Sequence, residues 1–234
     1  MDFKDYEAGV SEGSWQFVAK RELINSLLKK HFGRRSGKIL NVGAGTGEDL
    51  DVIGRYGEIT VVEPDPGAIK LIKDRCKCIV KPIEKTGFNK EFDVALAFDV
   101  LEHIKDADKG AKAIWNALKP GGLLIGAVPA RMSLWSAHDV ELGHHRRYSK
   151  SMLFRHLKDF EPLFVSGWNV VLLPAIWARY KLKKLLGRQT RETGKVSPPV
   201  NFVLKNILRC EILCAQLGLP LPTGVSLVFV FRKR

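Results

Sequence analysis

The sequence predicts an α/β fold, in which strands of a parallel sheet alternate with helices. Three observations support this. Short apolar runs alternate with helical patterns between residues 38 and 128, a glycine-rich turn (43–47) follows the first run, and Glu63 ends the second. Ligands of open α/β sheets bind at the carboxyl ends of the strands. The turn and the acid should therefore share one binding edge.

Length and composition narrow the class of protein. The chain has 234 residues, enough for one large domain, and is 45% apolar and 27% charged, which excludes disorder, collagen and coiled coil. No uncharged apolar run approaches the ~20 residues of a membrane-spanning helix. The residues after Met1 form no apolar signal core, so we expect a cytoplasmic protein.

The net charge of +13 suits an acidic partner, such as nucleic acid, an anionic membrane surface or a phosphorylated substrate. A basic surface that only keeps the protein in solution is the alternative. The four cysteines form the pairs Cys76/Cys78 and Cys210/Cys214, which lack the CxxC spacing of a zinc knuckle. We expect them to be reduced thiols.

The first half of the chain shows the alternation directly. A helix is expected over 14–32, where apolar residues recur until Gly33 stops it. A proline at position 66 opens a second helix, and Lys119–Gly122 ends another over 107–118. Strands are expected at 38–42, 58–62, 76–80, 92–98 and 123–128.

After Pro129 the regular alternation of strands and helices ends. A polar and aromatic loop is expected over 130–150, followed by a helix that carries His156. A sixth strand is expected at 164–173 and a last strand at 225–231. Between them lies an insertion (174–222), with helices around 175–186 and 200–217.

The glycine turn differs from a dinucleotide-binding loop. It reads Gly43-x-Gly45-x-Gly47, and Glu48 stands where the fingerprint needs another glycine. Glu48 and the following Asp49 would repel a pyrophosphate, which argues against a nicotinamide-dependent oxidoreductase. A carboxylate at the end of the second strand can accept hydrogen bonds from two ribose hydroxyls. The alternative is an ordinary strand-to-helix turn.

Several motifs, in order, resemble class I S-adenosylmethionine-dependent methyltransferases. They are Ile39–Gly47, Glu63, Phe92–Val94, Asp99–His103 and Leu118–Gly122. The chain departs from the family at Asn41, where an acid is usual, and at Lys81, which replaces an acid near the adenine. Segments around Trp15–Leu23, Gly143–Tyr148 and Leu219–Leu227 resemble a type 11/12-like subgroup whose substrate is uncharacterised.

The resemblance implies a Rossmann-like sheet of seven strands, mostly parallel, with an antiparallel last strand. It also implies one methyltransferase domain over 1–234. Its parts would be a helical cap (1–36), a cofactor-binding half (37–130), an acceptor-side segment (131–173), a helical insertion or lid (174–222) and the last strand (223–234).

S-adenosylmethionine is the implied cofactor. The expected contacts are the strand-end residues Gly43, Ala44, Gly45, Gly47, Glu63, Pro64 and Asp65, together with Ile83 against the adenine and Asp99 near the methionine end. Trp15 and Arg21 could form a flap, with Arg21 reaching the cofactor carboxylate. The alternative for these two is a packing helix with a solvated arginine.

A hydroxyl acceptor must lose a proton, and histidine is the natural base near neutral pH. The candidates are His103, after the fourth strand, and His144, in the loop after the fifth. Arg146 could clamp an acceptor phosphate or carboxylate. The alternatives are a hydrogen-bonded His103 that only borders the pocket, and a loop packed by its own side chains.

The same segment is similar to ubiquinone-pathway O-methyltransferases and to small-RNA 2′-O-methyltransferases, which hold a metal ion there. The matching residues are Asp99, Glu102, His103 and His144. Oxygen and imidazole ligands suit a divalent ion. Many family members with the Glu-His pair use no metal, so a divalent ion is possible but not expected.

We therefore expect methyl transfer to a hydroxyl of a small-molecule, glycan or lipid-linked acceptor. An RNA methyltransferase and a protein that holds the cofactor without turnover are the alternatives. The insertion places aromatic and aliphatic side chains among the cations Arg179, Lys181, Lys183, Lys184, Arg188 and Arg191. This basic segment could contact a membrane surface, cover an apolar acceptor as a lid, or be an ordinary surface helix. Nucleic acid is the less favoured partner.

Overall fold

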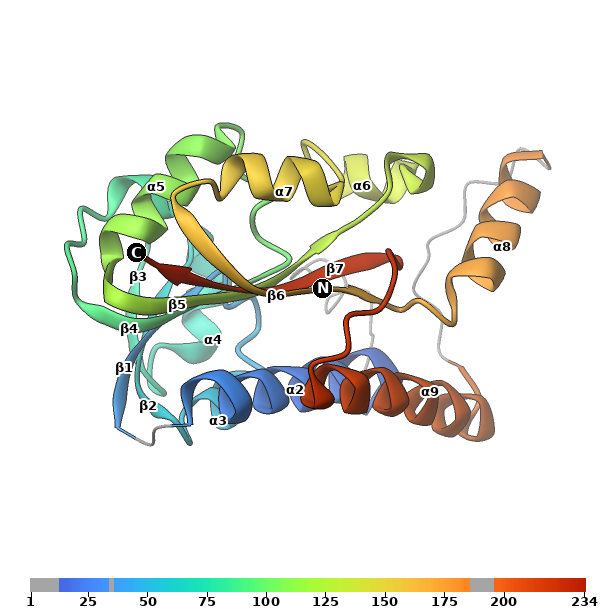
Figure 1. The fold of residues 1–234 in the computed structure, drawn as a ribbon, viewed down its shortest axis with the longest axis horizontal. Helices are drawn as coiled ribbons and strands as arrows, with labels where there is room; N and C mark the ends of the chain where they lie inside the picture. The colour runs from blue at the N-terminus through green and yellow to red at the C-terminus, as the bar shows by residue number, and fades with distance from the viewer. Residues whose placement is uncertain (1–12, 34–35, 186–195) are drawn as a thin grey trace.

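A computed structural model describes residues 13–33, 36–185 and 196–234. Its centre is a seven-stranded sheet in the order β3-β2-β1-β4-β5-β7-β6 (Figure 1). The strands are β1 (Gly37–Val42), β2 (Gly57–Val62), β3 (Lys77–Ile79), β4 (Phe92–Phe98), β5 (Leu118–Pro129), β6 (Phe160–Trp168) and β7 (Ser226–Lys233).

The strand directions confirm the expected Rossmann-like sheet. β1 pairs in parallel with both β2 and β4, and β4 pairs in parallel with β5. β7 is antiparallel to its neighbours β5 and β6. The chain moves outward from β1 to β3 and then returns to the other side of β1 as β4. The crevice for a ligand therefore opens at the carboxyl ends of β1 and β4, where the strand order reverses.

Helices cover both faces of the sheet (Figure 1). Buried apolar residues of α2 (Trp15–Leu27), α3 (Leu50–Ile53), α4 (Pro66–Ile72) and α9 (Pro198–Leu217) share one core cluster with the strands. Those of α5 (Ala107–Ala117) and α7 (Lys150–His156) share the cluster on the opposite face. Strands buried on both sides explain why the sequence shows continuous apolar runs.

The N-terminal helix agrees with the expectation over 14–32. α2 continues as a π-helical turn (Leu28–Phe32), and Gly33 ends it with φ +67°. A left-handed residue cannot continue the helix, and glycine adopts this conformation without strain.

The sixth strand lies earlier than expected. β6 pairs with β7 from Phe160 to Trp168, and the next residue, Asn169, has a φ of +59° that an extended strand does not continue through. The apolar residues that follow have no partner strand, because β7 begins opposite Trp168. The segment expected as a loop over 130–150 also contains a 3₁₀ turn (Met132–Leu134) and α6 (Ala137–Glu141).

The insertion forms two helices, as expected: α8 (Leu173–Leu185) and α9. Leu186, Arg188 and Arg191 of the basic segment lie outside the described residues. In the part of the chain that the structure describes, no helix combines the length and hydrophobicity needed to cross a membrane.

Candidate functional site

A cavity of about 460 Å³ opens at the carboxyl edge of the sheet. Strand ends, the first turns of α2 and the loop after β5 supply its walls. The lining residues include Gln16, Lys20, Gly43, Ala44, Gly45, Glu63, Pro64, Asp65, Phe98, Asp99, Glu102, His103, His138, Leu142, His144, Arg147, Val225 and Ser226. The cavity thus joins the predicted cofactor turn to the predicted histidines.

One wall of the cavity is made by backbone. Gly43 and Gly45 follow β1 with φ +71° and +51°, a conformation that favours glycine. A Cβ on Gly45 would meet no atom within 4 Å, so this turn leaves open space for a ligand. Glu63 accepts hydrogen bonds from the N–H groups of Gly45 (3.2 Å) and Asp65 (3.1 Å). The carboxylate of Glu63 is therefore held beside the turn, where a ribose would be recognised.

Asp99 and Lys20 add charge next to this wall. Asp99 directly follows β4 and has a φ of +57°, a conformation in which short polar residues are enriched. Lys20 of α2 enters the cavity and pairs with Asp49 at 3.1 Å. Burial alone would lower the pKa of Lys20, but Asp49 and Asp99 outweigh burial and raise it. Lys20 therefore keeps its positive charge inside the site.

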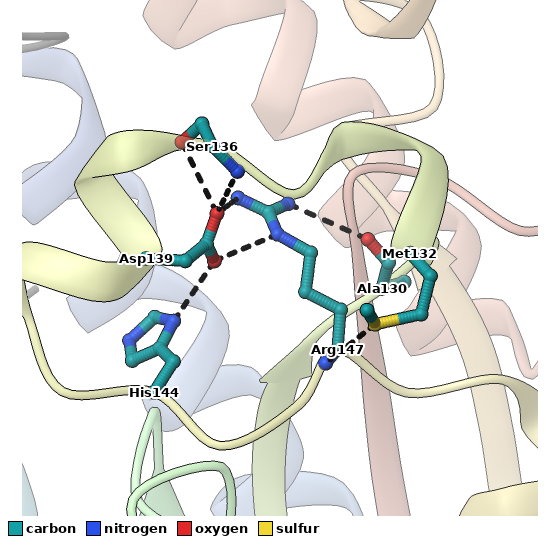
Figure 2. A network of polar contacts seen from close by, with 6 residues as sticks. All are labelled: Ala130, Met132, Ser136, Asp139, His144 and Arg147. Atoms are coloured by element: carbon teal, nitrogen blue, oxygen red, sulfur yellow. Dashed lines mark hydrogen bonds and ion pairs between the residues drawn. The ribbon is translucent and has the colours of Figure 1, made fainter.

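The opposite wall depends on one buried carboxylate, Asp139 of α6 (Figure 2). Arg147 donates to both of its oxygens, from Nε to Oδ1 (2.8 Å) and from Nη2 to Oδ2 (3.0 Å). Ser136 donates its N–H (2.8 Å) and its hydroxyl (3.1 Å) to Oδ2. His144 Nδ1 lies 2.9 Å from Oδ1. Asp139 thus connects α6 to the Arg147 and His144 side chains of the loop that follows.

This network keeps Asp139 ionised. Burial alone would raise the pKa of Asp139, but the hydrogen bonds from His144 and Arg147 outweigh burial and hold the pKa well below its usual range. A carboxylate beside Nδ1 makes that nitrogen the donor of a neutral imidazole and leaves Nε2 as the acceptor. His144 lines the cavity, so its acceptor nitrogen is available at the site.

Glu102 is the least satisfied polar group of the cavity. Both of its carboxylate oxygens are buried without a hydrogen-bond partner. Burial, and secondarily Asp99, raise the pKa of Glu102 well above its usual range. Ligand atoms of Glu102, His103 and His144 lie within 4.8 Å of one another, and the two imidazole rings meet edge to face with centroids 4.6 Å apart. Of the four residues that match the metal-binding segment of the similar enzymes, these three form a compact group, which does not include Asp99.

Several expected site residues lie outside the cavity lining. The Trp15 N–H binds Asn201 Oδ1, and Ile83 is buried in the core. Arg21 is not in the lining either; the cavity side of α2 carries Gln16 and Lys20 instead. Among the strand-end glycines, Gly47 lies away from the cavity and its carbonyl accepts a hydrogen bond from Arg75.

The two neighbouring arginines, Arg146 and Arg147, lie differently from the expectation. Arg146 turns away from the cavity and donates to the Lys105 carbonyl, whereas Arg147 lies on the cavity wall. Sequence reasoning missed Lys20, Asp139 and Arg147. The Ser136-x-x-Asp139 spacing is a helix-start signal that could have identified Asp139. Nothing local to the sequence indicates that Arg147 is its partner.

The site can therefore hold a nucleoside beside Glu63 and place a reacting group among imidazoles. A family model described as a methyltransferase domain matches residues 13–164. Among curated relatives, a ubiquinone biosynthesis O-methyltransferase of Methylobacterium nodulans is 27% identical over 121 residues, covering 44% of this chain and 49% of the relative. A sterol 4-C-methyltransferase of Caenorhabditis elegans is 34% identical over 145 residues, covering 56% and 43%. The chain thus spans about half the length of these relatives.

Solved structures agree on the fold. A SAM-dependent methyltransferase from Archaeoglobus fulgidus superposes with a TM-score of 0.58 at 16% identity, covering 91% of this chain and 94% of the other. A geranyl diphosphate methyltransferase in complex with SAM superposes with a TM-score of 0.60 at 12% identity, covering 91% and 85%. Together with the family match, these likenesses show that the chain belongs to the methyltransferase domain family and has the class I methyltransferase fold.

Proposed function

We propose that this methyltransferase acts on a hydroxyl oxygen, with His144 as the base. S-adenosylmethionine supplies an electrophilic methyl group on a sulfonium. On the protein side, Glu63 would accept hydrogen bonds from the ribose hydroxyls. Lys20, a cation that lines the cavity near Glu63 and Asp99, would bind the cofactor carboxylate in place of Arg21.

The observation that carries the proposal is the hydrogen bond between His144 Nδ1 and Asp139 Oδ1, at 2.9 Å. Asp139 is fully buried and doubly bound by Arg147, so the imidazole is held in one orientation. Its Nε2 then takes the proton of the acceptor hydroxyl as the oxygen becomes methylated. Asp139 acts through His144 and is a positioning residue. A base so placed contributes about 10²–10⁴ in rate.

The acceptor class is supported by the composition of the cavity. Imidazoles, a carboxyl group of raised pKa and the apolar residues Leu142 and Val225 line it, which suits a neutral hydroxyl compound with an apolar part. The name of the Methylobacterium relative indicates O-methylation and that of the nematode relative C-methylation at a sterol. We therefore propose a small-molecule, glycan or lipid-linked alcohol or phenol as acceptor.

The test measures S-adenosylhomocysteine formation with a panel of phenols, glycosides and long-chain alcohols. With an acceptor that turns over, His144→Ala should lower kcat by at least about 100-fold, with cofactor affinity unchanged. The matched control is His145→Ala, because His145 is exposed and does not line the cavity. Equal activity of the two variants would contradict the base role. Methylation of carbon or nitrogen alone would contradict the acceptor class.

A second candidate for the same residues is a divalent metal ion that orients the acceptor oxygen. The buried, unpartnered oxygens of Glu102 favour it, and one carboxylate with two imidazoles is a donor set that such ions accept. Calorimetric titration with Co²⁺ separates the two candidates. Saturation at one equivalent, lost in Glu102→Ala, would replace the base role of His144 with ligation. Absence of binding leaves the base role in place.

A further inference from the structure

The helix α8 exposes large apolar side chains. None of its described side chains is buried, although they include Trp177 (43% exposed) and Leu182 (56% exposed). The helix stands apart from the sheet, at the same end of the molecule as the start of α9 (Figure 1). Exposed apolar side chains gathered in one region mark an interaction surface.

The helix α9 has two opposite apolar faces. One face packs against α2 and buries Leu208, Ile212 and Ala215. Residues spaced by three, seven, three and four positions form a stripe on the other side of the helix. That stripe is exposed and consists of Val200, Val203, Cys210, Leu213 and Leu217. Phe202 lies beside it and is 62% exposed. A helix that needed only to cover the sheet would carry polar residues there.

The charges of these two helices are mostly positive, and Arg209 of α9 is paired with Glu22 of α2. Residues 173–185 and 196–222 contain several lysines and arginines and a single acid, Glu211. Glu211 is buried and accepts a hydrogen bond from the Val171 N–H, so it is not presented to a partner. Lys181 lies over the ring of Trp177 at 4.0 Å, and Lys205 lies near the ring of Phe202 at 6.0 Å. The surface therefore presents cations beside the apolar side chains.

The same region adjoins the cavity. Asn201 of α9 binds the Trp15 N–H and the Gly13 carbonyl at the start of α2, the helix whose Gln16 and Lys20 line the cavity. At its other end the insertion returns to Val225 and Ser226, which also line the cavity. A partner bound to the start of α9 would therefore lie close to the wall of the cavity that α2 supplies.

We propose that this surface binds an anionic lipid bilayer. We define it by Trp177, Lys181, Leu182, Val196, Val200, Phe202, Val203 and Lys205. Aliphatic side chains enter the acyl boundary while lysines bind the anionic headgroups, which is how helices lie on a membrane. RNA fits less well, because bases stack on aromatic rings and the exposed apolar residues here are mostly aliphatic.

The inference rests on the proposed function only for its consequence: the cavity would receive a lipid-linked or other membrane-dissolved acceptor. Binding itself can be measured without any acceptor. The experiment uses the full chain and sedimentation with vesicles of phosphatidylcholine, with and without phosphatidylglycerol. Binding is expected only with phosphatidylglycerol, and salt should weaken it because the charge attraction is screened.

Paired variants test the two kinds of side chain. Trp177→Ser with Phe202→Ser should weaken vesicle binding by at least about tenfold, since two large apolar side chains no longer leave water. Its control is Leu71→Ser with Val80→Ser, exposed apolar residues on α4 and after β3. Lys181→Glu with Lys205→Glu should weaken binding by more than about fivefold at low salt. The control, Lys70→Glu on α4 with Lys73→Glu directly after it, should not weaken binding.

Three results would overturn the proposal. One is equal binding to vesicles with and without phosphatidylglycerol, or to neither. A second is dimerisation without vesicle binding, seen as a molecular mass that doubles as the protein concentration rises. If the Trp177→Ser, Phe202→Ser variant stays monomeric, the surface binds a second copy of the chain. The third is salt-dependent binding of a single-stranded RNA probe in the absence of vesicle binding. A methyltransferase that fails with every acceptor but binds anionic vesicles would contradict the proposed function and leave this inference standing.

Discussion

The two walls of the cavity are built in different ways. The wall after β1 and β2 is made of backbone in a glycine-rich turn and of one carboxylate, Glu63, that the turn itself holds. The wall after β5 is made of side chains that converge on a buried Asp139. The first arrangement joins a glycine turn to a carboxylate 18 residues later in the chain, whereas the second joins side chains within residues 136–147.

This difference fits the roles that we propose for the two walls. A cofactor shared by a whole family can be held by a shared backbone geometry, while an acceptor must be recognised by side chains that can change. Substitutions on the Asp139 wall should therefore alter stability and turnover. Substitutions on the glycine wall should alter cofactor affinity.

The largest effect is expected for Asp139→Asn. Removing one charge from a buried ion pair costs about 3–5 kcal/mol, because the other charge is left without its partner. Chemical denaturation of the variant should show this loss at neutral pH. The pKa of Asp139 in the folded protein lies below its ordinary value of 3.8. Its contribution to stability is therefore present above that value and lost as the pH falls through the folded-state pKa. The free energies of unfolding of the parent protein and of Asp139→Asn should therefore converge in acid.

The control for this variant is Asp108→Asn. Asp108 pairs with His156 at 2.9 Å on the surface, where its side chain is 71% exposed, and such pairs contribute about 0–1 kcal/mol. Equal losses in the two variants would mean that the buried network does not organise the second wall.

A smaller effect is expected at the boundary between the walls. Lys20→Met should weaken cofactor binding by about tenfold, because a charged hydrogen bond contributes about 1.5–3 kcal/mol. Arg21→Met should leave affinity unchanged, since Arg21 is not in the cavity lining. Calorimetry with S-adenosylhomocysteine measures both. The reverse order of effects would restore the sequence-based assignment to Arg21.

The smallest effect is expected for Ser136→Ala. The hydroxyl of Ser136 is one of two groups that this residue donates to Asp139, and the backbone N–H remains. Loss of such a helix-start residue costs about 0.5–2 kcal/mol. The midpoint temperature of thermal unfolding should fall modestly, while the affinity for the cofactor stays constant. A destabilisation as large as that of Asp139→Asn would show that α6, rather than the Arg147 pair, holds the wall.

The same contrast explains what could be predicted from the sequence. The strands β1 and β2, the glycine turn and the place of Glu63 follow from local patterns, because apolar runs, glycines and a strand-end acid determine backbone geometry. The bounds of β6 could not be predicted, since they depend on its pairing with β7, almost sixty residues later in the chain. The choice of Lys20 over Arg21 depends on how α2 rotates against the sheet. The choice of Arg147 over Arg146 depends on its ion pair with Asp139.

The central claim is that the turn after β1 and the carboxylate of Glu63 together hold the adenosyl cofactor. Calorimetric titration of the protein with S-adenosylmethionine tests it most directly, beside Glu63→Ala and a control variant, Glu58→Ala, whose side chain is exposed on β2. We predict one binding site in the parent protein. Glu63→Ala should lose more than tenfold in affinity, because two hydrogen bonds of ~1.5–3 kcal/mol each disappear. Glu58→Ala should bind as the parent protein does. Equal affinity of all three proteins, or no binding to the parent protein, would contradict the account.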